Sequence, residues 1–420
     1  MTREFPGGVL RPVVVGGLLV ATAALACATP ASADWLGGER PVTTGAGSQQ
    51  WPQLSGSRLV YTDESADGGF DVRVHDLDTG TDRAVTTDHS ATGRAAISGN
   101  RVVWVDSDAG VWYADLATGK HRRLSDGVGD GPSISGRLVC YTSLGDVHVH
   151  DLRTGSDQVV SAPAARASNC DISGELVVWQ DDRFGNADVF GYDLTTRTET
   201  RITSDPSGQT MPRVDGDLVV WQDDAKGADD TDIVAVDLST GVTTLVCGAV
   251  GAQSLPEVAQ GRIVWTDARF GDAAVFLYDM LSGVETRVTD DAGLSGGAAL
   301  SGGRIVYAQR SSGHHLFVRT ITPPVLSTEL APVVPGDLPR LSGVLARTDG
   351  LPVIAVVVQL ESSADGRAWV EAGSAVTAGD GSYAFTLPES PLPVWFRVRF
   401  DGAQDVAPVV GEPVRFEGAR

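Results

Sequence analysis

Short apolar runs recur along the first three quarters of the chain, and each is followed by a polar turn. One run reads Arg101-Val-Val-Trp104-Val-Asp106. Related runs centre on Tyr61, Trp104, Tyr141, Trp179, Trp221, Trp265 and Tyr307, and these aromatics are spaced 43, 37, 38, 42, 44 and 42 residues apart. A period of this length indicates one supersecondary unit copied along the chain.

Each copy predicts four short strands. A Ser-Gly turn such as Ser98-Gly99 precedes the aromatic strand, and a second apolar run ends in Asp, as in Tyr192-Asp193. A turn such as Asp78-Thr79-Gly80 and a short fourth strand complete the unit. Alternating or β-branched runs between turn residues are typical of strands, and no segment has a sustained helical period. Seven such units predict an all-β fold, a seven-bladed β-propeller.

The last copy, around Tyr307, lacks a fourth strand before Pro323-Pro324. Residues 39–44, Glu-Arg-Pro-Val-Thr-Thr, match residues 82–87, Asp-Arg-Ala-Val-Thr-Thr. We therefore expect residues 39–44 to form the outer strand of the last blade and to close the ring. Pro41 is compatible with this position because an outermost strand has a free edge.

The ends of the chain differ from the repeats. Residues 1–33 have the form of a signal peptide, with cleavage predicted after Ala33; a lipoprotein attached at Cys27 is the alternative. The propeller is expected over 34–322, a Pro-rich linker over 323–339 and a small immunoglobulin-like β-sandwich over 340–420.

The Val-Val-Trp-x-Asp strand, the Tyr-Asp-Leu strand and the Thr-Gly turn resemble the TolB-like, WD40-like β-propeller repeats of bacterial envelope proteins, over about residues 37–322. The tail resembles the immunoglobulin-like or carboxypeptidase-regulatory-like modules of secreted proteins. The resemblance implies a repeat fold and a secreted or cell-envelope location. It does not extend to the α/β domain that precedes the propeller in TolB, and it implies no catalytic site.

Composition limits the partners. The formal net charge is −22, from 54 acidic and 32 basic residues. Such a surface disfavours nucleic acid and anionic lipid. We expect a monomer without a membrane span that binds an extracellular protein or glycan. Besides Cys27, the chain has Cys140, Cys170 and Cys247, so at most one internal disulfide forms, and a Cys140–Cys170 bridge is left open.

Five carboxylates lie two residues after a repeat aromatic: Asp63, Asp106, Asp181, Asp223 and Asp267. Because they end equivalent strands, we expect them on one face, as a speculative ligand-binding ring. The alternative is that each carboxylate satisfies backbone amides in its own turn. Calcium is considered as a possible ligand at Asp182, Asp188, Asp224 and Asp232. No other cofactor is expected.

The leading expectation is a secreted, non-enzymatic binding or scaffold protein that presents a propeller face to a protein, glycan or envelope polymer. No catalytic residues are expected on this interpretation. The first alternative is a propeller-based lyase or hydrolase that uses carboxylates at the channel mouth. The second is a calcium-stabilised surface adhesion module.

Overall fold

The computed structural model is all-β. It describes residues 36–43, 45, 47–108, 110–125, 129–280, 283–289, 294–309, 314–321, 325–330, 338–346, 352–387, 393–401 and 409–417. No helix occurs among these residues, so none of them forms an apolar helix able to cross a membrane. They divide into two compact units, one within 41–276 and 291–318, the other within 36–40, 277–290 and 319–420.

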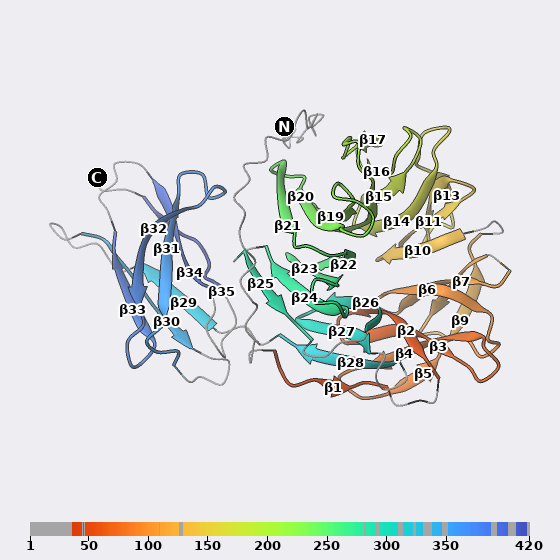
Figure 1. The fold of residues 1–420 in the computed structure, drawn as a ribbon, viewed down its shortest axis with the longest axis horizontal. Helices are drawn as coiled ribbons and strands as arrows, with labels where there is room; N and C mark the ends of the chain where they lie inside the picture. The colour runs from red at the N-terminus through yellow and green to blue at the C-terminus, as the bar shows by residue number, and fades with distance from the viewer. Residues whose placement is uncertain are drawn as a thin grey trace, which may run out of the picture. The chain divides into compact units, whose positions relative to one another are not determined.

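The repeats form antiparallel sheets (Figure 1). One sheet of eight strands comprises β2 (Gln49–Ser55), β3 (Arg58–Glu64), β4 (Phe70–Asp76), β5 (Asp82–Ala84), β6 (Ala91–Ser98), β7 (Arg101–Asp106), β8 (Val111–Asp115) and β9 (Lys120–Arg123). Its halves, β2–β5 and β6–β9, are joined by one residue pair, Phe70 with Ala91. Each half is therefore one four-stranded repeat.

The other repeats form separate four-stranded sheets. Three of them are β10 (Gly129–Ser135), β11 (Leu138–Ser143), β12 (Asp146–Asp151) and β13 (Asp157–Val159); β14 (Ala167–Ser173), β15 (Leu176–Asp181), β16 (Asp188–Asp193) and β17 (Thr198–Arg201); and β18 (Gln209–Asp215), β19 (Leu218–Asp223), β20 (Asp232–Asp237) and β21 (Val242–Cys247). The next is β22 (Gln253–Ala259), β23 (Arg262–Asp267), β24 (Ala274–Asp279) and β25 (Val284–Arg287). The last joins β26 (Leu294–Ser301), β27 (Arg304–Gln309) and β28 (His315–Thr320) to β1 (Arg40–Pro41).

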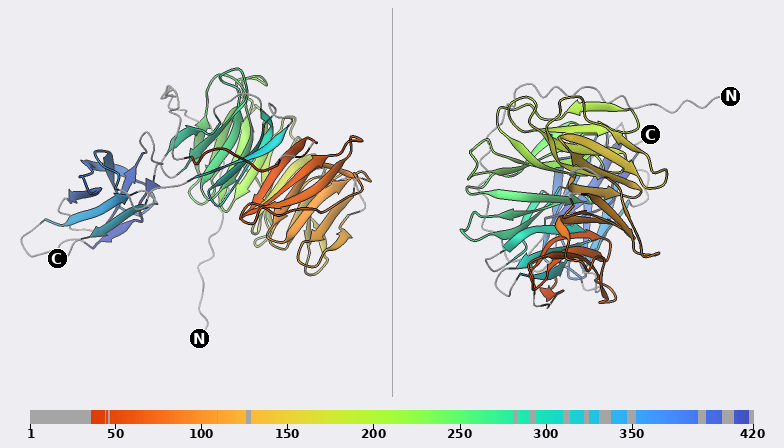
Figure 2. Two further views of the ribbon diagram at one scale, coloured as in Figure 1. Left: turned by 90° about the horizontal axis from the view of Figure 1, so that it is seen from below. Right: turned by 90° about the vertical axis from the view of Figure 1, so that its right-hand side faces the viewer.

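The first strand of each repeat lies innermost, as Figure 1 shows for β6, β10, β22 and β26. We call β2, β6, β10, β14, β18, β22 and β26 the inner strands. Each contacts the inner strand of the next repeat, and β26 contacts β2. The sheets are twisted and stand side by side around a common axis (Figure 2), which is the arrangement of a β-propeller.

The repeat aromatics form the core between sheets. Trp179 and Trp265 are fully buried and stack on Phe190 and Phe276 of the neighbouring strand, with ring centroids 6.0 and 5.9 Å apart. The indole N–H of both donates to the Asp two residues later, from Trp179 to Asp181 over 3.2 Å and from Trp265 to Asp267 over 2.9 Å. The Trp-x-Asp motif therefore pairs a large apolar group with an acceptor for its one polar atom.

The Ser-Gly turns connect one repeat to the next. The Ser55 hydroxyl oxygen accepts from the Gly99 amide at 2.9 Å, and Ser98, Ser135 and Ser173 accept in the same way from Gly136, Gly174 and Gly216. The Gly56 amide donates to Ser301, which lies 245 residues later in the chain, over 3.0 Å. Equivalent turns are thus linked by equivalent hydrogen bonds, including one between the first and last repeats.

Residues 42 and 43 make the bonds to β28 that residues 85 and 86 make within their own sheet. The Val42 amide donates to the Leu316 carbonyl at 2.7 Å, and the Thr43 hydroxyl accepts from the Leu316 amide at 2.9 Å. The corresponding bonds of Val85 and Thr86 to Val72 are 2.7 and 2.9 Å. The match between 39–44 and 82–87 thus corresponds to the same backbone geometry, although Thr44 lies outside the described residues.

The second unit contains two sheets around one core. The first is β29 (Val325–Leu330), β30 (Arg340–Ala346) and β33 (Ser382–Thr386); the second is β31 (Val357–Ser363), β32 (Val370–Val376), β34 (Val394–Phe400), β35 (Val409–Val410) and β36 (Val414–Phe416). Leu341, Val358, Tyr383 and Phe396 share the core. The segment expected as a linker, 323–339, contains β29, which pairs with β30.

Thr43→Val replaces the hydroxyl with a methyl group, so the Leu316 amide loses its acceptor and the Gln49 side chain loses a donor. We expect the free energy of unfolding to fall by about 1 to 2 kcal/mol. Thr86→Val, the matched variant within one sheet, should lose a similar amount. Denaturant unfolding of both variants tests this, and a Thr43→Val protein as stable as wild type, beside a destabilised Thr86→Val, would contradict the docking of residues 42–43.

Candidate active site at the propeller axis

Most inner strands contain a β-bulge at the same place. The bulge residue adopts a left-handed conformation even where it is not glycine; Trp51, Asn169, Met211 and Leu255 have φ of 49°, 52°, 53° and 54°. Regular pairing resumes two residues later, at Gln53, Ser133, Asp171, Arg213 and Glu257 in the respective strands. Bulges redirect side chains, and a left-handed conformation of a non-glycine residue costs about 1 to 2 kcal/mol. Four of these five residues therefore follow a backbone conformation that costs free energy, whereas Ser133 follows Gly131, which adopts a positive φ freely.

Three of these residues, together with Arg94 of β6, form what we call the axial cluster: Arg94, Asp171, Arg213 and Glu257. The Glu257 carboxylate accepts from both guanidinium groups, at 3.0 Å from Nε of Arg213 and in a short contact from Nη2 of Arg94. Arg94 and Glu257 are 163 residues apart in sequence. The pair therefore joins two repeats that are not neighbours in the chain.

Asp171 is held separately within the cluster. One carboxylate oxygen accepts from the Ser133 hydroxyl at 2.6 Å, and the other accepts from the Val214 amide at 2.9 Å. Arg213 also donates from Nη1 to the Pro212 carbonyl at 2.7 Å. The side chains of Arg94, Glu257 and Arg213 keep 28%, 17% and 10% of their surface exposed, so these three charged groups are not fully buried.

The two carboxyl groups have pKa values shifted in opposite directions. Burial raises the pKa of Asp171 above its ordinary value, and the charge of Arg213 and the Ser133 hydrogen bond offset only part of this rise. Burial also acts to raise the pKa of Glu257, but the charges of Arg94 and Arg213 outweigh it and hold that pKa below its ordinary value. When the pKa values of two neighbouring carboxyl groups are shifted apart in this way, the group with the raised pKa can donate a proton and the other can accept one.

The two arginines differ as well. Burial lowers the pKa of Arg94, and Glu257 offsets only part of that effect. For Arg213 the charges of Glu257 and Asp171 outweigh burial and raise the pKa. Both guanidinium groups stay charged at neutral pH, because an arginine pKa lies far above it. The axis therefore presents fixed positive charge beside an ionised and a more easily protonated carboxyl.

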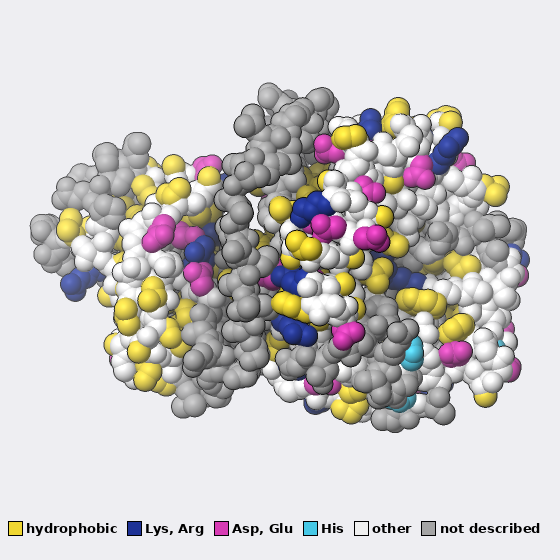
Figure 3. All heavy atoms as spheres, in the orientation of Figure 1, with side chains coloured by type: hydrophobic (Ala, Val, Ile, Leu, Met, Phe, Trp, Pro, Cys, Tyr) yellow, Lys and Arg dark blue, Asp and Glu magenta, His cyan; other side chains and the backbone are white. Residues whose placement is uncertain are grey.

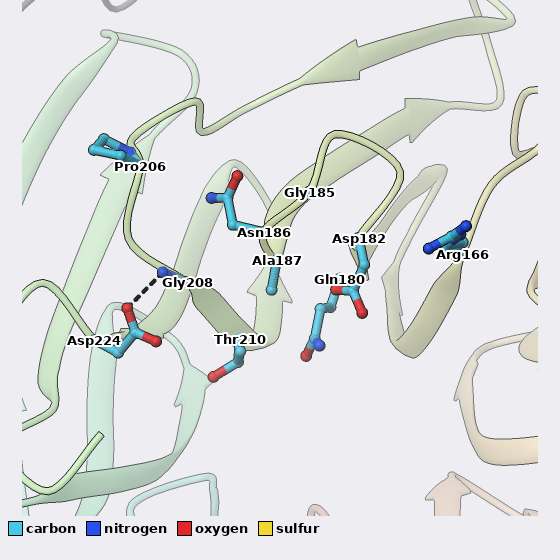
Figure 4. A pocket seen from close by; sticks show the side chains of 10 residues that line it. All are labelled: Arg166, Gln180, Asp182, Gly185, Asn186, Ala187, Pro206, Gly208, Thr210 and Asp224. Carbon is cyan, nitrogen blue, oxygen red and sulfur yellow. Dashed lines mark hydrogen bonds between the residues drawn. The ribbon is translucent and has the colours of Figure 1, made fainter. Parts of the chain in front are cut away.

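A polar pocket of about 550 Å³ lies between the sheets β14–β17 and β18–β21. Its lining residues are Arg166, Gln180, Asp182, Gly185, Asn186, Ala187, Pro206, Gly208, Thr210 and Asp224 (Figure 4). The Asp224 carboxylate accepts from the Gly208 amide at 2.5 Å. Amide, hydroxyl, carboxylate and guanidinium groups in one open pocket suit a hydroxyl-rich ligand. None of the axial cluster residues lines it, although Thr210 precedes Arg213 on β18.

The predicted ring residues lie at equivalent strand ends, and each bonds within its own repeat. Asp63 accepts from Gln49 at 2.7 Å, Asp106 from the Ser107 amide at 2.6 Å and Asp223 from the Ala225 amide at 2.9 Å. The fully buried Asp181 and Asp267 accept from a tryptophan and from Arg183 and Arg269. Among the described residues no hydrogen bond joins two of these carboxylates. All but Asp63 also accept from a backbone amide in the turn that follows, as turn acceptors do.

The four residues considered for calcium are dispersed. Asp182 and Asp224 line the pocket, whereas Asp188 accepts from Arg201 at 2.7 Å and Asp232 accepts from Lys226 at 2.9 Å. Over the part of the chain that the structure describes, no three His, Cys, Asp or Glu side chains are grouped to hold a metal ion. Calcium binding stays a prediction. On the face in Figure 3, acidic side chains are scattered among basic and apolar ones.

Sequence reasoning missed the axial cluster, although a signal was present. When the repeats are aligned on the Ser-Gly turn, the residue two before the serine position is Gln53, Ala96, Ser133, Asp171, Arg213, Glu257 and Ala299 in turn. This position lies on the inner strand of every repeat. The polar residues found there in different repeats are therefore candidates to lie close together. Arg94 does not fall at this position, because the bulge of β6 contains one more residue.

Solved structures resemble part of the chain, whereas no family model and no curated protein matches it. An oligogalacturonate lyase in complex with manganese shares 14% identity and a TM-score of 0.53, covering 67% of this chain and 93% of that chain. The β-propeller domain of the Trilobed protease from Pyrococcus furiosus has 12% sequence identity and a TM-score of 0.51. The match covers 65% of this chain and 95% of that domain. A puromycin hydrolase has 14% sequence identity to this chain and a TM-score of 0.52. The match covers 76% of this chain and 62% of the hydrolase. The likeness shows the β-propeller fold.

These comparisons correct the leading expectation of a non-enzymatic binding or scaffold protein. The similar structures are lyases and hydrolases, including two oligogalacturonate lyases that are covered almost end to end. That expectation rested on the lack of a catalytic constellation among the carboxylates that repeat at the strand ends. The charged residues of unequal pKa lie instead on the inner strands, at the axis.

Glu257→Gln keeps the side-chain shape but leaves Arg94 and Arg213 without a carboxylate. At neutral pH we expect the free energy of unfolding to fall by about 3 to 5 kcal/mol. Because the pKa of Glu257 is lower in the folded than in the unfolded chain, its stabilisation is present above the ordinary glutamate range and is lost as pH falls through the folded value. Denaturant unfolding from neutral to acidic pH should show the gap to wild type narrowing; a pH-independent gap contradicts this.

Proposed function

We propose that the chain is a carbohydrate-cleaving propeller enzyme, a lyase that acts on uronate-containing oligosaccharides at the axial cluster. The observation that carries the proposal is the convergence of Asp171, Glu257 and two arginines from four inner strands. Their opposite carboxyl pKa shifts supply a proton donor and a proton acceptor in one place.

Each residue has one role in an elimination. Arg94 and Arg213 bind the uronate carboxylate, which makes the neighbouring C–H bond more acidic because their charge stabilises the developing anion. The ionised Glu257 takes that proton as the base. Asp171 gives its proton to the departing glycosidic oxygen as the C–O bond breaks and a C=C bond forms. The Ser133 hydroxyl keeps Asp171 in position.

The substrate class follows from the charges and the pocket. A net charge of −22 repels an anionic ligand at long range, whereas the two arginines at the axis offer local positive charge that can bind one sugar carboxylate. The polar pocket would hold neighbouring hydroxyl groups of the same oligosaccharide. Similarity to oligogalacturonate lyases, which differ from this chain at most positions, agrees with this class.

We also propose the finer architecture around this site. Seven blades surround the axis, and residues 39–44 close the ring as the outer strand of the last blade; the pairing of β1 with β28 and the Gly56–Ser301 bond support this. The second unit is proposed to be an immunoglobulin-like module. Residues 1–33, which lie outside the described residues, are proposed to export the protein, so its substrate is an extracellular glycan.

Purified protein lacking residues 1–33 should cleave uronate oligosaccharides to products with the ultraviolet absorbance of a conjugated C=C–carboxylate group. Asp171→Asn and Glu257→Gln should each lower kcat/KM by about 10²- to 10⁴-fold, the range for loss of a general acid or base. Asp106→Asn is the matched control, because that carboxylate bonds to the Ser107 amide in its own turn.

New reducing ends without ultraviolet absorbance would show hydrolysis in place of elimination. Uncleaved substrate with every uronate oligosaccharide tested, or full activity in folded Asp171→Asn protein, would contradict the proposal.

A further inference from the structure

Two buried cysteines of neighbouring sheets face each other. Cys140 on β11 and Cys170 on β14 have their Sγ atoms 2.8 Å apart, across a sequence separation of 30 residues. Their exposed fractions are 0% and 3%, and both belong to one apolar cluster with Trp179. A disulfide has a sulfur–sulfur distance of about 2.05 Å, so forming the bond needs a movement of under about 1 Å.

We propose that Cys140 and Cys170 form a disulfide that joins the sheets β10–β13 and β14–β17. The third cysteine, Cys247, lies elsewhere, on β21, and interacts with Arg269 and Asp267. Of the three described cysteines, only Cys140 and Cys170 are therefore placed to form a disulfide with each other. The proposal is independent of the proposed enzymatic activity.

The oxidant is the disulfide of a thiol–disulfide oxidoreductase, or oxidised glutathione in vitro. One cysteine thiolate attacks this disulfide, forms a mixed disulfide and releases one thiol of the oxidant. The second cysteine, as a thiolate, then attacks the mixed disulfide. The Cys140–Cys170 bond forms, and the oxidant is left as two thiols, in one oxidoreductase chain or as two glutathione molecules, which carry the two electrons and, after protonation, the two protons of the original thiols.

Timing follows from burial. In the folded chain burial and the neighbouring thiol raise the pKa of Cys140, and only the thiolate is the attacking species. We therefore expect the disulfide to form during folding, while both thiols are still accessible to the oxidant. Cys170 immediately precedes Asp171 in the same bulge, so the bridge also fixes the strand segment that carries this carboxyl.

The direct test is peptide mapping of the chain from residue 34, refolded with reduced and oxidised glutathione, then denatured and alkylated without reduction. We expect one alkylated cysteine, Cys247, and a linked Cys140–Cys170 peptide that is lighter by two hydrogen atoms than the reduced pair. Cys247→Ser should keep the linked peptide, and Cys140→Ser should abolish it. Alkylation of all three cysteines in refolded wild type would overturn the proposal.

Thermal unfolding gives a second readout that does not depend on a cysteine variant folding. Closing a loop of this length restricts the unfolded chain, so reduction should lower the Tm of wild type by about 5 °C or more. Cys247→Ser should show the same fall on reduction. An equal Tm for mapped oxidised and reduced wild type would contradict a stabilising bridge, whereas loss of lyase activity alone would leave the mapping result unaffected.

Discussion

A single repeat of this protein cannot bury its own aromatic strand, and the rest of the structure depends on this constraint. Each four-stranded sheet has apolar side chains that need the next sheet to cover them. Cys140 and Val147 of one repeat pack with Trp179 and Phe190 of the next. Leu59 and Tyr61 of the first repeat pack with Val306 and Leu316 of the last. Burial between sheets therefore arranges the inner strands around the axis.

The same arrangement creates the electrostatics of the axis. Inner strands that lie about 40 residues apart in sequence bring their polar side chains within hydrogen-bonding distance. An isolated charge at this depth would be costly, but Glu257 is neutralised by two guanidinium groups. Asp171, with a hydroxyl and an amide as donors, retains the raised pKa of a buried acid. Packing thus places a cluster of charged side chains where no single repeat has one.

The sequence predicted the local structure well, because that structure is encoded within each repeat. The run from Arg101 to Asp106 is β7, and the Asp76 carboxylate accepts from the amides of Asp78 and Thr79 in its turn. The strand β29 was predicted as part of a linker because the segment is rich in proline. Its position at a sheet edge is one where neighbouring prolines are tolerated.

The axial cluster could not be predicted from local pattern. Its members look like unrelated polar residues in four different repeats, and Arg94 is displaced by an additional bulge residue. The Trp-x-Asp motif drew attention to Asp181 and Asp267 because it repeats, but repetition there reflects a structural bond between indole and carboxylate. Three of the four members, Asp171, Arg213 and Glu257, occupy a position that all repeats share but fill with different residues.

The most direct measurement is a crystal structure of the Asp171→Asn protein soaked with a uronate oligosaccharide. The account predicts the sugar carboxylate within hydrogen-bonding distance of Arg94 or Arg213, with Glu257 beside the C–H bond next to that carboxylate. An oligosaccharide bound only in the pocket around Asp182 and Asp224, with the two arginines still paired to Glu257, would contradict catalysis at the axis.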